Sequence, residues 1–369
     1  MKKVLSCAAL LALSFVATSV LAAGPGLSDM ERLGKRLYNT RELSWDRTQS
    51  CATCHHKMAG FADPTNARDP YNTFVSLGDN RIDKGGRNAP TAAYCGFSPI
   101  LGINADGNWQ GGMFWDGRAT GETLGDPLAE QAQGPPLNPV EMNMPDVETI
   151  ITRIETSRIA PLFEKVFGPD AFADVDQAYD DLAAAIASYE RSSEISPFNS
   201  RFDRGELTAR EENGFVIFQN NCAQCHSTDS VEGAAGPLFT NYQYENIGVP
   251  TNTALLADEG SVYDGNDLGL GYVVGGENGK FKVPTLRNIA GTAPYSHNGY
   301  FPTLYDMVSF HNSRDVADAG WPEPEISENL NTTDVGDMGL TPAQIDDVVA
   351  FLNSLTDSKT MGGGGRKSR

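Results

Sequence analysis

Long apolar runs and basic residues are both scarce in this sequence of 369 residues. Only Val4–Leu21 is apolar over a long run, so no later segment is expected to cross a membrane. Lys and Arg number 28 against 48 Asp and Glu, which gives a formal charge of −20. An acidic surface repels nucleic acid and anionic membranes. It favours a basic or locally basic protein partner, the alternative being that the charge only aids solubility.

The first residues are typical of a secretory signal peptide. Lys2-Lys3 precedes the apolar run, and the small-residue pattern Val20-Leu21-Ala22 fits a cleavage site. We predict that residues 1–22 are removed. The mature protein is then expected in the periplasm, without a membrane span.

Two copies of the pattern C-x-x-C-H dominate the chain: Cys51-Ala-Thr-Cys54-His55 and Cys222-Ala-Gln-Cys225-His226. This pattern is typical of covalent c-type haem, in which both thiols bond to the haem vinyl groups and the His ligates iron. A zinc site would need two further Cys or His near each pair, and the chain has only three other His. We predict two covalent haems with His55 and His226 as iron ligands. Cys95 belongs to neither motif and is expected to be a small buried residue.

The chain is an imperfect internal repeat. Helix-like segments precede the two motifs, over Leu27–Asn39 and Thr208–Gln219. Each half closes with an amphipathic helix whose apolar residues recur at intervals of three and four, over Val175–Tyr189 and Thr341–Leu355. A helix before C-x-x-C-H and one after it are the packing helices of a cytochrome c domain. The predicted fold is mainly α, with two cytochrome c-like domains and long Gly/Pro-rich loops.

The predicted organisation has four parts, with Ser192–Asp203 linking the two halves. They are a signal peptide at 1–22, an N-terminal domain at 23–195, a C-terminal domain at 196–357 and a flexible tail at 358–369. We expect the long loops inside each domain to be held by the haems and by each other.

Six further segments lie in order around both motifs. They are Arg87-Asn-Ala-Pro-Thr91, Phe114-Trp-Asp-Gly-Arg118, Ala129-Glu-Gln-Ala132, Asn138-Pro-Val-Glu-Met142, Phe281-Lys-Val-Pro-Thr-Leu-Arg-Asn288 and Thr292-Ala-Pro-Tyr-Ser-His-Asn-Gly299. Together they resemble the bacterial dihaem cytochrome c peroxidase family, which includes MauG. The resemblance runs from about Leu27 to Leu355. It implies that the N-terminal haem reacts with peroxide and the C-terminal haem transfers electrons.

The resemblance also bears on which haem keeps an open face. A haem held by His on both sides cannot bind peroxide, whereas a five-coordinate haem can. Classical peroxidases of the family carry a second His on a loop shortly after the first motif, but residues 57–81 contain none. His56 adjoins a ligand and cannot reach the other face. This departure predicts an N-terminal iron already open to peroxide, as in MauG.

The family takes the sixth ligand of the C-terminal haem from the position fourteen residues beyond the His of its His-Asn-Gly motif. Peroxidases have Met there and MauG has Tyr, whereas this chain has His311. We predict a low-spin, bis-His haem. Met307 and Met338 are alternative ligands, and a solvated His311 is a further alternative. His297, the motif His itself, is expected near the haems and on a propionate rather than on iron.

The resemblance implies the remaining catalytic residues. Glu141 aligns with the distal Glu that moves protons during O–O cleavage, and Gln131 and Pro135 align with other pocket residues. Burial raises and ferric iron lowers the pKa of such a Glu, so its direction is not predicted. Trp115 aligns with the Trp between the two haems. The alternatives are a solvated charge for Glu141 and an ordinary core position for Trp115.

A calcium ion between the domains is common in the family. Asn88, Thr292 and Pro294 match its ligands, the last two through backbone carbonyls, and such oxygen ligands suit this cation. Asn88 as a simple turn residue is the alternative.

Three functions compete at this point. The first is a MauG-like oxidase that uses hydrogen peroxide to oxidise a residue of a periplasmic partner protein. The second is a cytochrome c peroxidase that removes hydrogen peroxide with electrons from a small donor cytochrome. The third is a non-enzymatic dihaem electron carrier. The missing second His favours the first over the second, and the distal Glu argues against the third.

Overall fold

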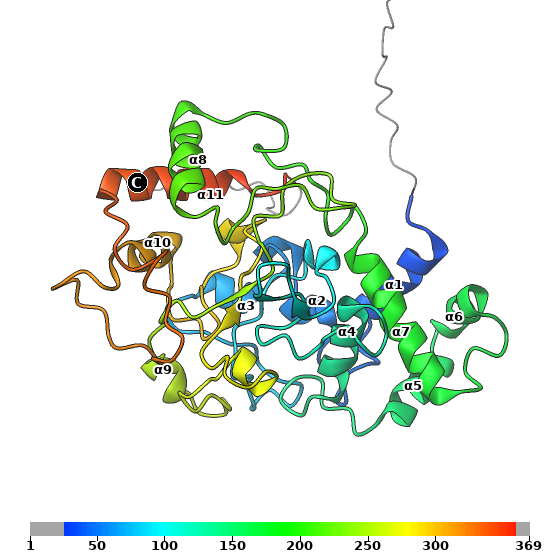
Figure 1. Ribbon diagram of the computed structural model, residues 1–369. Coiled ribbons are helices and arrows are strands. Elements are labelled where there is room, and N and C mark those ends of the chain that lie inside the picture. Colours follow the sequence, from blue (N-terminus) through cyan, green and yellow to red (C-terminus); the bar gives the residue numbers. More distant parts are fainter. Residues whose placement is uncertain (1–25, 359–369) are drawn as a thin grey trace, which may run out of the picture.

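Helices provide most of the regular structure in residues 26–358, the part of the chain that the computed structural model describes (Figure 1). They are α1 (Asp29–Asn39), α2 (Cys51–Cys54), α3 (Pro64–Arg68), α4 (Pro127–Leu137), α5 (Val147–Glu155), α6 (Ala160–Phe167), α7 (Val175–Glu190), α8 (Ala209–Asn221), α9 (Thr253–Leu256), α10 (Leu304–Ser313) and α11 (Pro342–Ser354). The predicted mainly α fold is confirmed. The predicted signal peptide and residues 359–369 of the predicted tail lie outside the described residues.

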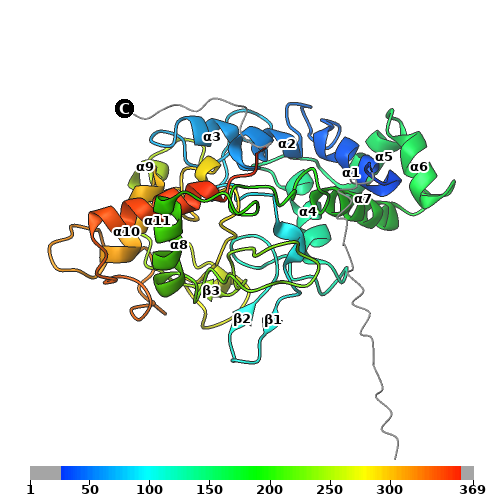
Figure 2. The same cartoon turned by 90° about the horizontal axis from the view of Figure 1, so that it is seen from above.

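Four short strands form two antiparallel pairs within the loops. They are β1 (Gly102–Ile103) with β2 (Trp109–Gln110), and β3 (Tyr244–Glu245) with β4 (Phe281–Lys282). The β1–β2 hairpin projects from the body of the molecule in Figure 2. None of the helices in residues 26–358 is long and apolar enough to cross a membrane.

The four helices predicted around the haem motifs are confirmed, and local capping explains where three of them begin. Ser28, Thr208 and Thr341 each form a capping box with the Glu or Gln three residues later, at the starts of α1, α8 and α11. Such a box satisfies two backbone N–H groups that have no partner inside the helix. At the start of α7 the Asp174 carboxylate accepts bonds from two backbone N–H groups. The two halves therefore begin their first helices in the same way.

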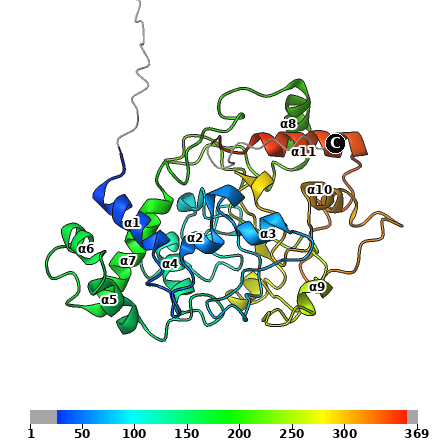
Figure 3. The same ribbon diagram turned by 180° about the vertical axis from the view of Figure 1, so that it is seen from behind.

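The internal repeat extends to the packing of these helices. α1 packs against α7 in one half and α8 packs against α11 in the other (Figures 1 and 3). An added Cβ at Gly34 would lie 1.8 Å from the carbonyl oxygen of Ala185, and one at Gly214 would lie 1.9 Å from that of Asp347. Each contact brings two helix backbones together so closely that only glycine fits.

The two largest of the four hydrophobic clusters in residues 26–358 lie mainly one in each half. The first is built mainly on α1, α4, α5 and α7, and it also takes Leu238 from the second half. The second is rich in aromatic rings, with Phe218, Phe239 and Phe351 in mutual contact. Because Leu238 packs in the first core, the halves share side-chain contacts. The division of the chain at residues 195 and 196 stays a prediction.

The end of the second half is tied back to the first half. Asp357 is 1% exposed, and its carboxylate accepts a hydrogen bond of 2.7 Å from the Tyr94 hydroxyl. It also accepts one of 3.1 Å from the backbone N–H of Asn199, in the predicted linker. These bonds hold the linker and the chain end against the first half.

We predict that Gly214→Ala destabilises the protein although Ala is the better helix former by about 1 kcal/mol. The added methyl overlaps the backbone of α11, and overpacking of this kind costs about 1–3 kcal/mol. The measurement is the midpoint of chemical unfolding followed by circular dichroism. The matched control is Gly275→Ala, because an added Cβ there meets no atom within 4 Å. Equal midpoints for the two variants would contradict the close approach of α8 and α11.

Candidate functional site

A cavity of about 540 Å³ lies beside the first C-x-x-C-H motif. α2 supplies the two thiols, α4 borders one side, and Ile186 and Glu190 border it from α7. All the residues predicted for the peroxide site line this cavity: Cys51, Cys54, His55, Trp115, Gln131, Pro135 and Glu141. Residues separated by up to 90 positions in the sequence are thus brought together around one space.

His55 is oriented for ligation through its second ring nitrogen. Its Nδ1 lies 3.1 Å from the carbonyl oxygen of Phe61. A carbonyl only accepts hydrogen bonds, so Nδ1 carries the proton and Nε2 keeps its lone pair, as in metal-binding imidazoles. Burial lowers the pKa of His55, which keeps the ring neutral. Among the described residues that line this cavity, His55 is the only His.

Glu141 lies in the turn that follows α4. Its Oε1 accepts a bond of 2.6 Å from the Asn138 side chain, and its backbone carbonyl accepts one of 2.7 Å from the N–H of Asp79. Burial raises the pKa of the Glu141 carboxyl, while Arg118 and Asn138 act in the opposite direction. The structure thus supplies the direction that the sequence left open. A raised pKa makes the Glu141 carboxylate a stronger base than an exposed Glu.

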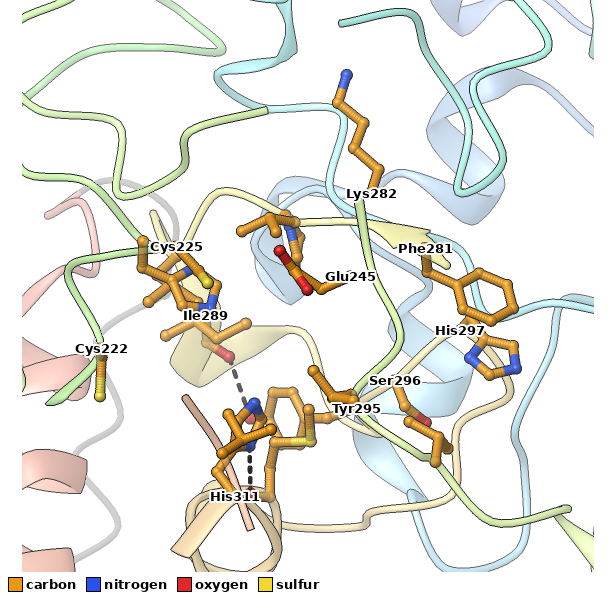
Figure 4. Close-up of a pocket in the computed structure, with 18 of the residues that line it drawn as sticks. Cys222, Cys225, Glu245, Phe281, Lys282, Ile289, Tyr295, Ser296, His297 and His311 are labelled. Carbon is orange, nitrogen blue, oxygen red and sulfur yellow. Dashed lines mark hydrogen bonds between the residues drawn. The ribbon is translucent and has the colours of Figure 1, made fainter. Parts of the chain in front are cut away.

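The second cavity, of about 200 Å³, surrounds the second motif (Figure 4). Cys222 and Cys225 lie on one side of it, and His311 projects into it from α10. The Nδ1 atoms of His226 and His311 lie 3.0 and 2.8 Å from backbone carbonyl oxygens, so each ring keeps Nε2 free. Burial lowers the pKa of His226 to about 4 and lowers that of His311. Met307 and Met338, the alternative ligands, line the same cavity.

The other two His have different surroundings. The His297 ring stacks on Phe281 with centroids 3.6 Å apart, and its Nε2 lies 3.3 Å from Oε2 of Glu325 (Figure 4). The Nε2 atom of His297 therefore faces a carboxylate. The Nδ1 of His56 accepts a bond from the backbone N–H of Met58, and His56 lines neither cavity.

Trp115 and Asn88 line both cavities. The indole N–H of Trp115 donates to the backbone carbonyl of Asn88 over 2.9 Å. The Asn88 side-chain amide donates to the carbonyl of Phe74, which leaves its Oδ1 as an acceptor. Thr292 and Pro294 line the second cavity together with Asn88. Since residues 26–358 contain no cluster of three acidic, His or Cys side chains suited to a metal, a cation here would depend on amide and carbonyl oxygens.

A chain of ion pairs and hydrogen bonds between the cavities was not predicted. Ion pairs join Arg118, Asp116, Arg87 and Asp267. The backbone N–H of Asp267 then donates to the Glu325 carboxylate, which also lies against His297. Burial disfavours the charge of Arg87, but Asp267 and Asp116 outweigh this and raise its pKa. Arg87 and Asp116 both lie in segments that carry the family resemblance, yet no local pattern showed that Asp267 would meet them.

Two protein-family models together match nearly all of the described residues. The model of the di-haem cytochrome c peroxidase family matches residues 28–211, and the cytochrome c model matches residues 211–356. The methylamine utilization protein MauG of Paracoccus denitrificans is 37% identical, over 96% of this chain and 96% of the relative. The cytochrome c peroxidase Ccp of Escherichia coli is 31% identical, over 88% of this chain and 57% of the relative.

Solved structures agree with these relatives. The diheme peroxidase BthA of Burkholderia thailandensis superposes with a TM-score of 0.76 at 30% identity, covering 90% of this chain and 87% of that one. A MauG-like protein associated with microbial copper homeostasis superposes with a TM-score of 0.66 at 25% identity, covering 92% of each chain. The two matched regions correspond to two cytochrome c-type domains and imply two haems.

Proposed function

The chain belongs to the dihaem cytochrome c peroxidase and MauG family of oxidoreductases. We propose that the protein uses hydrogen peroxide at the N-terminal haem and oxidises a residue of a partner protein. The observation that carries this proposal is the first cavity, where His55 is the only His among the described lining residues. A resting site without a second imidazole needs no prior reduction to admit peroxide.

The residues of both cavities suit covalently attached haem. Each cavity has two thiols and a buried, neutral imidazole whose Nε2 is free: His55 in the first and His226 in the second. When bound, a haem supplies an iron centre that accepts the two oxidising equivalents of peroxide. His311 would supply the second imidazole of the C-terminal haem, because it enters the same cavity as His226 and its Nδ1 is held by the carbonyl of Met307.

Glu141 is the acid-base residue of this reaction. Its carboxylate takes a proton from the peroxide oxygen that would bind iron. It then gives this proton to the other peroxide oxygen, which leaves as water. The Asn138 amide holds Oε1, so Oε2 is the atom that is free to carry the proton. Gln131 and Pro135 line the same cavity from α4 and shape the space around this carboxyl.

Trp115 connects the two sites. It lines both cavities, and its hydrogen bond to Asn88 fixes the indole between them. An aromatic ring in this position shortens the distance over which charge must move, so both domains can share the oxidising equivalents. His297, held by Phe281 and Glu325, lines the second cavity, where it would bond to a haem propionate rather than to iron.

A cytochrome c peroxidase is the second candidate function. Relatives of both kinds match this chain, and a peroxidase would receive electrons from a small cytochrome instead of taking them from a protein residue. The carboxyl of Glu141 serves either reaction, so the identity of the electron source is the difference. The absence of a second imidazole among the described residues of the first cavity favours the MauG-like reaction.

Two further properties complete the proposal. The protein acts in the periplasm after loss of residues 1–22, where its partner protein or donor cytochrome is also located. A calcium ion binds near Asn88, Thr292 and Pro294 and stabilises the contact between the domains. The free Oδ1 of Asn88 and the shared cavity lining of the three residues support this site.

The function is tested by adding one equivalent of peroxide to the diferric protein without any reductant. We expect absorption changes at both haems, followed by slow return that a protein substrate accelerates. Reduced small c-type cytochrome serves as the comparison donor. No reaction until one haem is reduced would contradict the proposal, and rapid steady turnover of the cytochrome would favour the peroxidase.

We predict that Glu141→Gln slows the reaction with peroxide by about a hundredfold or more, because a positioned acid-base group contributes about 10²–10⁴-fold. The measurement is stopped-flow absorption with excess peroxide. Both haems should stay attached, since the side-chain hydrogen bond of Glu141 is to Asn138 and not to a Cys. Glu148→Gln is the control, because Glu148 is exposed on α5. An unchanged rate in Glu141→Gln would assign proton transfer to another group.

We predict that His311→Ala converts the low-spin signal of the C-terminal haem to high-spin. Loss of the second imidazole removes one strong-field ligand while His226 remains. His56→Ala is the matched control, because His56 lines neither cavity. A low-spin signal that survives in His311→Ala, together with a sulfur-to-iron band at the red end of the wild-type spectrum, would assign the ligand to Met307 or Met338 instead.

A further inference from the structure

Glu190 is a buried carboxyl in the first cavity that takes no part in the peroxide reaction proposed for Glu141. It is the last residue of α7, is 6% exposed, and lines the cavity together with Ile186 one turn earlier. Its carboxylate makes no hydrogen bond or ion pair among the described residues. Burial raises the pKa of Glu190 to about 8.

The groups around Glu190 stabilise its charged form less than burial disfavours it, although Arg191 acts to lower its pKa. Arg191, the nearest cation, pairs with Asp126 at 2.6 Å and so is already neutralised. The Tyr38 hydroxyl donates to the carbonyl of His55, and the Cys95 thiol donates to that of Thr91.

The remaining neighbours also offer no cation or free donor. The Tyr189 hydroxyl bonds to Glu194, and Cys51 is a thioether once haem is attached. The carbonyl end of α7 further disfavours a negative charge at this position. Glu190 is thus a carboxyl with a raised pKa that lines the haem cavity.

The position of Glu190 separates it from the distal acid. α7 packs against both α1 and α4, and Ile186 and Glu190 line the cavity from α7, whereas Glu141 lines it from the turn after α4. Glu190 and Glu141 act electrostatically on the same thiol, Cys51, but neither acts appreciably on the other. The two carboxyls are therefore independent groups on one cavity.

We propose that Glu190 is a redox-linked proton site of the N-terminal haem. An electron that enters this haem adds negative charge to a cavity with little water, so a carboxylate beside it takes up a proton from solvent. Removal of an electron has the opposite effect, and Glu190 releases that proton. The coupling is reciprocal by thermodynamic linkage: proton binding favours reduction as strongly as reduction favours proton binding. Glu190 adjusts the charge beside the haem and does not touch peroxide.

This role would let the cavity keep its net charge when peroxide withdraws electrons. Glu141 moves a proton between the two peroxide oxygens, whereas Glu190 exchanges one with solvent. The proposal rests on haem binding in the first cavity and holds whether a protein residue or a cytochrome is the electron source.

The test is the midpoint potential of the N-terminal haem between pH 6 and pH 10, measured at an electrode with mediators and without peroxide. In the wild type we expect the potential to fall with rising pH around pH 8, by at most about 59 mV for each tenfold change in proton concentration. Glu190→Gln should be nearly flat across this range. Glu194→Gln, on the exposed chain just after α7 and paired with Lys35, should keep the wild-type slope.

Two outcomes would overturn the proposal. One is a slope that persists in Glu190→Gln. The other is a wild-type potential that does not change with pH. A slope that is kept in Glu190→Gln but lost in Glu141→Gln would assign the proton to the distal acid. Because no peroxide is present, either outcome leaves the proposed function standing.

A second measurement applies if Glu190→Gln does not hold haem. It is the redox-induced infrared difference spectrum of Glu141→Gln, in which the distal acid cannot contribute. We expect the carbonyl band of a buried carboxylic acid to change on reduction at pH 8. No carboxylic acid band at any pH from 6 to 10 would contradict the proposal.

Discussion

Arg87 holds the two halves of the molecule against each other. Its guanidinium pairs with Asp116 of its own half and with Asp267 of the other half, each at 2.6 Å. These side chains are largely buried, so the loss of the cation would leave Asp267 without its ion-pair partner in a medium where this is costly, while Asp116 would keep only Arg118. The next residue, Asn88, accepts the indole bond of Trp115. The segment that joins the halves therefore also holds the ring that lies between the two cavities.

The two cavities share one way of fixing an imidazole and differ in what faces it. His55 and His226 both direct Nδ1 to a backbone carbonyl, which leaves Nε2 for iron. In the second cavity His311 repeats this arrangement from α10, whereas the first cavity offers the carboxyls of Glu141 and Glu190. In the proposed function, this asymmetry gives one domain proton chemistry and the other a closed, electron-storing site.

Much of this architecture could be predicted from local sequence. The helices beside both motifs follow from apolar periodicity and from caps such as Ser28 and Thr208, which act within one turn. Features that depend on distant residues could not be predicted. Gly34 is needed only because α7 lies 1.8 Å from where its Cβ would be. Glu190 looks like an ordinary polar helix end, and its isolation depends on Arg191 turning to Asp126, 65 residues away.

The central claim is that the first iron is open and the second is closed by His311. Electron paramagnetic resonance of the diferric protein as isolated, before any reductant or peroxide is added, tests it most directly. The account predicts one high-spin and one low-spin haem in equal amounts. Two low-spin signals would mean that a protein ligand closes the first cavity, and two high-spin signals would mean that His311 does not bind the second iron. Either result would contradict the account.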